Sequence, residues 1–134
     1  MPNENPSEKF LVPSLTAQDL RNKVLALRIE DTKRTEKFRT IMPDRLLDHV
    51  LKSAEHMAEK GCEYDRFSLD YDFIMLMIED WPDVVSSLGG SEWFKQLCIQ
   101  DRHHLIAVLK DSLEGRGFTC EIALMEENII KLYW

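Results

Sequence analysis

The chain has 134 residues, of which 44% are hydrophobic, and a formal net charge of −7. This length predicts one domain with its own core, and the apolar content excludes a disordered chain. The acidic balance makes direct nucleic-acid binding an unexpected function, because Lys and Arg drive binding to phosphates. The longest apolar run, 73–78, is far shorter than the roughly 18 residues of a membrane span, and the first residues lack the features of a secretory signal. We therefore expect a cytoplasmic protein that makes no membrane contact.

The cysteines and histidines do not form a recognisable metal motif. Cys62, Cys98 and Cys120 have no metal-type spacing, and an odd number of cysteines fits reduced thiols in a cytosol. His103 and His104 are adjacent, and neighbouring helical residues point about 100° apart, so they do not chelate one ion together. We expect no metal site and no cofactor.

Residues 1–13 hold three prolines and few apolar groups, which predicts an extended N-terminal arm. Residues 14–134 are then expected to form a single domain. Thr16 can cap a helix that begins at Ala17, with Asp19 in the position where a capping box usually has Glu.

The helical segment from 17 to about 40 is amphipathic only in its first half. Its apolar stripe consists of Leu20, Val24 and Leu27, and Leu25 is a further candidate member. Residues 30–37 are nearly all polar, so either one long helix leaves the core or a break occurs near 31–32. Met42-Pro43 then predicts an interruption, because the residue before proline avoids helical angles.

The clearest helix is expected over 44–60, where apolar residues recur at spacings of three and four and Gly61 stands at the C-cap position. A strand is expected near 62–70, with a change of phase at Arg66-Phe67 that suggests a bulge.

The following segment is expected to contain short helices. Asp72 can cap an apolar helix from 73 to about 81, and Pro82 can begin a further turn. Gly89-Gly90-Ser91 predicts a break, and Trp93 lies in the apolar cluster that follows, where we expect it to be part of the core.

The last third of the sequence predicts a helix over 101–115 followed by two strands near 118–125 and 128–134. In the hairpin, alternate residues are apolar, which is typical of antiparallel strands with one face packed on helices. The sequence therefore predicts an α+β fold: a small antiparallel sheet with a C-terminal β-hairpin and helices packed on one face.

Charge is concentrated in one segment. Residues 62–83 carry seven acidic residues against one basic residue, Arg66, a local charge of −6. An acidic stretch of this kind is either a solvated surface or a face that binds a basic partner. An aromatic side chain in such a stretch can anchor a partner protein. The candidate partner-binding residues are Asp65, Asp70, Asp72, Glu79, Asp80, Trp81 and Asp83.

Asp70 and Asp72 permit a second interpretation. Two carboxylates at i and i+2 of a strand share a face, where they can hold magnesium or take part in acid–base chemistry. The same residues also suit a strand end and a helix cap. Because no Lys, His or glycine-rich loop accompanies them, we do not expect an enzyme.

Three sequence pieces resemble a class of small tailed-phage proteins, mostly of unassigned role. In that class a helix ends in an A-x-x-G stop before a strand, a later helix ends in L…GF or L…GY, and a hairpin closes with I-x-(I/L)-x-W. The matching pieces here are Ala58-Glu59-Lys60-Gly61, Leu113 to Gly117-Phe118, and Ile130-Lys131-Leu132-Tyr133-Trp134.

The resemblance spans roughly residues 17–134, including the basic leading helix over 17–37. The helical insert from 73 to 97 departs from the layout. The class implies a viral accessory or virion role and carries no active site to transfer.

Three functions remain open from the sequence. The first is a non-catalytic protein–protein interaction protein, phage-encoded, that serves as an accessory protein or binds and inhibits a host factor through the acidic, aromatic-containing surface. The second is a self-assembling structural or virion component that uses the leading helix or an open sheet edge. The third is a small metal-dependent hydrolase or nuclease built on Asp70 and Asp72.

Overall fold

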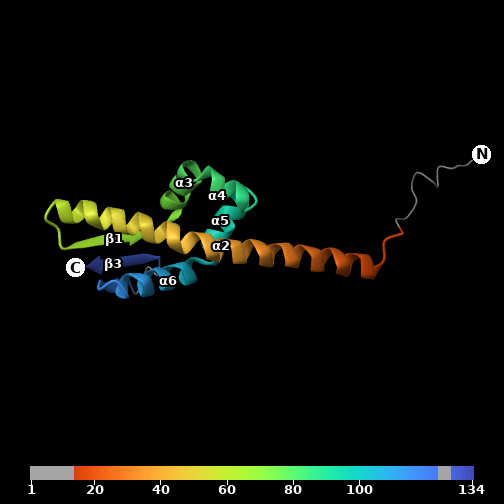
Figure 1. Cartoon of the computed structure of the whole chain (residues 1–134). Coiled ribbons are helices and arrows are strands. Elements are labelled where there is room, and N and C mark those ends of the chain that lie inside the picture. Colours follow the sequence, from red (N-terminus) through yellow and green to blue (C-terminus); the bar gives the residue numbers. More distant parts are fainter. Residues whose placement is uncertain (1–13, 124–127) are drawn as a thin grey trace, which may run out of the picture. The chain divides into compact units, whose positions relative to one another are not determined.

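The computed structural model describes residues 14–123 and 128–134 and confirms an α+β fold (Figure 1). A three-stranded antiparallel sheet has the strand order β1-β3-β2. The elements in chain order are α2 (Ala17–Glu59), β1 (Tyr64–Ser68), α3 (Tyr71–Asp80), α4 (Pro82–Ser87), α5 (Ser91–Gln100), α6 (Arg102–Glu114), β2 (Thr119–Ile122) and β3 (Ile129–Tyr133). Among the described residues, no helix is both long and apolar enough to span a membrane.

The chain divides into two compact units, and the division falls after Lys33, inside α2. We call residues 17–33 of this helix the leading segment and residues 34–59 the core segment. The predicted capping box is confirmed at the start of the leading segment: the Thr16 amide donates to Asp19 Oδ2 at 2.9 Å, and the Asp19 amide donates to Thr16 Oγ1 at 3.1 Å. All residues of the leading segment are exposed.

The predicted interruption at Met42-Pro43 is wrong, because α2 continues through Pro43 to Glu59. The helix also has no break near 31–32. A proline inside a helix costs about 3 kcal/mol, since it removes one main-chain hydrogen bond and crowds the preceding turn. Burial of a large apolar side chain contributes about 1.5–3 kcal/mol, and the core segment buries one residue every fourth position. These residues are Phe38, Met42, Leu46, Val50 and Ala54.

Gly61 ends the turn after α2, as predicted. Its φ of +86° lies in the left-handed region that favours glycine. The Gly61 amide donates to the Ala58 carbonyl at 2.9 Å, and the Cys62 amide donates to the Met57 carbonyl at 3.0 Å. The chain therefore reverses within a few residues and enters β1.

The predicted bulge at Arg66-Phe67 is wrong. Each residue of β1 pairs in turn with one residue of β3, from Tyr64 with Tyr133 to Ser68 with Ile129. The change of phase in the sequence arises because Tyr64 lies exposed on the outer face of the strand, whereas Phe67 is buried on the inner face.

Helices cover one face of the sheet, as predicted. The buried side chains of that face are Phe67, Cys120, Ile130 and Leu132. On the opposite face Tyr64, Arg66 and Lys131 are exposed. Residues 124–127, which include the end of the strand predicted near 118–125, lie outside the described residues.

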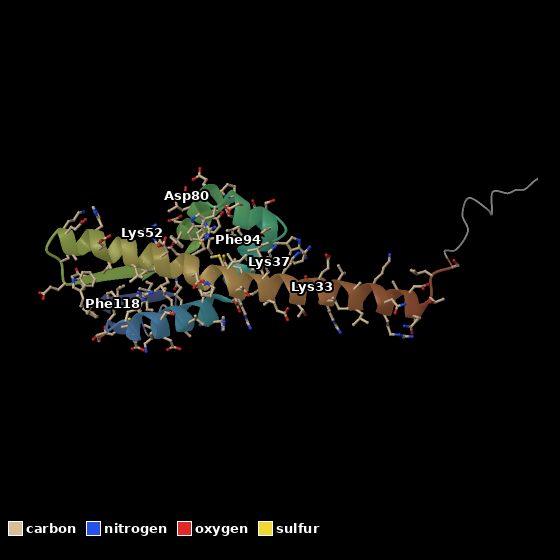
Figure 2. All side chains as sticks on the ribbon, in the orientation of Figure 1. Lys33, Lys37, Lys52, Asp80, Phe94 and Phe118 are labelled. Carbon is tan, nitrogen blue, oxygen red and sulfur yellow. The ribbon has the colours of Figure 1, made fainter. Side chains whose placement is uncertain are left out.

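The core joins the core segment of α2 to the shorter helices. Phe38 and Phe94 meet edge to face with ring centroids 6.0 Å apart, and Figure 2 shows Phe94 on the side of α5 that faces α2. The described residues include one buried charged side chain, Asp101, whose carboxylate accepts from Arg39 Nη2 at 2.6 Å and Nε at 2.9 Å. This pair ties α2 to the junction of α5 and α6.

Candidate partner-binding surface

Helix α3 begins earlier than predicted, and this changes the roles of two acidic residues. Asp70, not Asp72, is the N-cap: its Oδ1 accepts from the Phe73 amide at 2.9 Å. Asp72 lies exposed in the first turn, where a carboxylate interacts favourably with the helix dipole. Because β1 already ends at Ser68, Asp70 and Asp72 do not share the face of a strand.

The geometry on which the magnesium hypothesis depended is therefore absent. Within 14–123 and 128–134, no group of three or more His, Cys, Asp or Glu side chains is arranged to hold a metal ion.

The outer surface of α3 combines three exposed acidic and three exposed apolar side chains. Ile74 and Met77 are buried on the inner side of the helix. Because residues four apart stack on one side of a helix, the exposed residues form two adjacent rows. One row is Tyr71, Met75 and Glu79, and the other is Asp72, Leu76 and Asp80. We call these six residues the α3 outer face, and Figure 2 shows Asp80 at its end.

The end of α3 is fixed to α2 through Trp81. Trp81 is half-buried against the core, and the guanidinium carbon of Arg45 lies 5.5 Å from the centre of its ring. Arg45 also forms an ion pair with Asp83 of α4 at 3.3 Å. Two of the predicted partner-binding residues, Trp81 and Asp83, therefore make contacts within the protein, while Glu79 and Asp80 remain on the exposed surface beside them.

Asp65 stands apart from the other acidic residues. It belongs to β1, and its Oδ2 accepts from the Ser53 hydroxyl of α2 at 2.7 Å. Its Oδ1 accepts from the amide of Arg66 at 2.8 Å. These bonds give Asp65 a role in joining β1 to α2, so the structure does not gather all of the predicted residues on one helix.

His49 of α2 packs against α3 and β1. Its ring lies 4.9 Å from that of Phe73 in α3 and 5.9 Å from that of Phe67 in β1. Burial lowers the pKa of His49, and the negative charges of Asp65, Asp48 and Asp80 oppose that shift. A half-buried, aromatic-lined imidazole therefore helps to fix the position of α3 against α2 and β1.

Three residues of the α3 outer face were not predicted from the sequence: Tyr71, Met75 and Leu76. The run 73–78 was predicted only as part of a short apolar helix, with no exposed side assigned to it, and two of its six residues are exposed. The repetition of acidic and apolar residues at i and i+4 in this segment was the sequence signal that could have predicted them. The expectation for Trp93 was also wrong, because its ring is exposed and the guanidinium carbon of Arg34 lies 4.2 Å from its centre.

Comparisons of the chain with protein-family models, with curated proteins and with solved structures give no match.

Proposed function

We propose that this chain is a non-catalytic protein-interaction protein that binds a partner through the α3 outer face. The observation that supports the proposal is the mixture of side chains on that face: Tyr71, Met75 and Leu76 are exposed together, between three carboxylates. Single exposed apolar residues are normal on a protein surface, but three on one short helix form a patch of the kind that partner proteins cover.

The chemistry of this face favours a partner with basic and apolar side chains. Tyr71 supplies a rigid aromatic contact, and Met75 supplies a flexible, polarisable one that adapts to different shapes. Asp72, Glu79 and Asp80 would attract Lys or Arg side chains at the rim and increase the rate of association. An apolar centre with a charged rim is the usual anatomy of a protein interface.

The phage accessory role implied by the sequence resemblance belongs to this proposal. On that view the partner is a protein of the host cell, and binding alone, without chemistry, would alter its activity.

Photo-crosslinking combined with matched charge reversals tests the proposal. A photoreactive side chain replaces Leu76, and an equivalent one replaces Ala107, an exposed residue of α6. In host lysate we expect one protein adduct from position 76 and none from position 107. The captured protein is then purified, and its association with the intact chain is measured at several salt concentrations.

The decisive comparison uses two triple variants with the same change of net charge. Asp72→Lys, Glu79→Lys and Asp80→Lys alter the α3 outer face, whereas Glu59→Lys, Glu63→Lys and Asp111→Lys alter exposed acids elsewhere. We expect the first triple to slow association at least about tenfold and the second to change it much less. Equal losses in both triples, or an unchanged rate in the first, would contradict binding at the α3 outer face.

A further inference from the structure

The leading segment of α2 carries an apolar stripe whose side chains are exposed, with nothing in 14–123 or 128–134 burying them. Ala17, Leu20, Val24 and Leu27 follow the alternating spacing of three and four that places residues on one seam of a helix. The three larger side chains are 51%, 47% and 60% exposed. The predicted stripe is therefore real, but it contributes nothing to the monomer core.

The leading segment has few interactions that stabilise its helical structure. It has the Thr16–Asp19 capping box and local side-chain bonds, such as that from Gln18 Nε2 to Asn22 Oδ1 at 2.9 Å. The cap contributes about 1 kcal/mol and a side-chain pair only tenths of a kcal/mol. Helices of this length are marginal in water unless an apolar face is packed. A second helix laid along the stripe would supply that packing.

We infer that the leading segment pairs with the same segment of a second copy, in antiparallel orientation. The charges beside the stripe select this arrangement. In a parallel pair, Asp31 would face Asp31 of the second copy across the seam, and Lys23 would face Arg28. Both contacts join like charges.

In an antiparallel pair, contacts between opposite charges replace these contacts between like charges. With Val24 opposite Leu27 of the second copy, Lys23 lies opposite Glu30, and Arg21 lies next to Asp31. Each of these contacts occurs twice by symmetry. Arg21 and Arg28 also approach one another on the other side of the seam, and the carboxylate of Asp31 lies between them and offsets that repulsion.

The size of the contact sets the expected affinity. Seventeen helical residues extend about 25 Å, so two of them bury less than the roughly 1,200 Å² typical of stable interfaces. A dissociation constant in the micromolar range is therefore expected, and the monomer and dimer would exchange as concentration changes.

Sedimentation equilibrium of the full chain from about 1 to about 300 µM tests the pairing. We expect a reversible monomer–dimer equilibrium that weakens at least about tenfold in Leu20→Glu and in Leu27→Glu. The matched controls are Leu25→Glu and Ile29→Glu, which alter apolar residues of the same segment that are 57% and 48% exposed but lie off the stripe. A chain that remains monomeric at the highest concentration, or equal weakening by the stripe and control variants, would overturn the inference.

Charge reversal tests the orientation. Lys23→Glu should weaken an antiparallel dimer, because it places a carboxylate against Glu30 of the second copy, whereas it would strengthen a parallel dimer by removing the like-charge contact with Arg28. Glu30→Lys should also weaken the antiparallel dimer, and the double variant should restore it. These residues lie in an exposed segment, so an unchanged thermal unfolding transition would show that the core remains folded in each variant. A stronger dimer in Lys23→Glu would overturn the antiparallel arrangement.

Discussion

The two segments of α2 form a single helix but are stabilised in different ways. The core segment buries a side chain every fourth residue from Phe38 to Ala54, and this burial outweighs a proline in its middle. The leading segment has good helix formers and a capping box but buries nothing. Helical structure is thus set by tertiary packing in one segment and by local interactions in the other, and only the first is expected to persist independently of concentration.

The largest expected difference between the two segments is in the free energy of unfolding after a leucine is truncated to alanine. Leu46→Ala removes a fully buried side chain and should lower the free energy of unfolding by about 2–5 kcal/mol through lost burial and a cavity. Leu27→Ala changes an exposed residue and should alter the free energy by less than about 0.5 kcal/mol in dilute protein. Urea titrations followed by circular dichroism measure both. Similar losses would mean that the leading segment is packed in the monomer.

Removing a proline from the core segment and adding one to the leading segment should change the free energy of unfolding by smaller amounts, which differ between the two segments. Pro43→Ala restores a main-chain donor inside the core segment and should raise the free energy of unfolding by about 1–2 kcal/mol, less than the full cost of proline because part of its ring burial is lost. Ala26→Pro should reduce the helical signal of the leading segment but leave the global unfolding midpoint unchanged. A lower midpoint in Ala26→Pro would contradict the separation of the two segments.

The smallest effect should be the pH dependence contributed by His49 of the core segment. Because the folded state holds the pKa of His49 below its usual value, the unfolded chain binds the proton more readily. The contribution of neutral His49 to the free energy of unfolding is fully present above about pH 6.5, and it is lost as the pH falls through the lower pKa of the folded state. Unfolding free energies measured between pH 7.5 and pH 5 should therefore decline less steeply in His49→Gln than in the native chain. The matched control is His56→Gln at an exposed position, and it should retain the native slope.

Local signals in the sequence predicted the features that local chemistry determines. The Thr16–Asp19 capping box, the Gly61 reversal and the alternating hairpin each depend on a few neighbouring residues. The α+β class followed from these elements.

The wrong predictions concern features that depend on contacts between residues far apart in the sequence. Pro43 suggested an end to the helix, and only burial against other elements explains why α2 continues. Trp93 was expected in the core, but the position of α5 leaves it exposed. The candidate site was predicted only in part, because the acidic residues were visible as a charge run whereas the arrangement of Tyr71, Met75 and Leu76 depends on which side of α3 is buried.

Amide hydrogen exchange along α2, measured at low and at high protein concentration, tests the contrast between the two segments most directly. We predict strong protection of the core segment at both concentrations. The leading segment should exchange rapidly in dilute protein and become protected as the dimer forms. Protection of the leading segment equal to that of the core segment, and independent of concentration, would contradict the account.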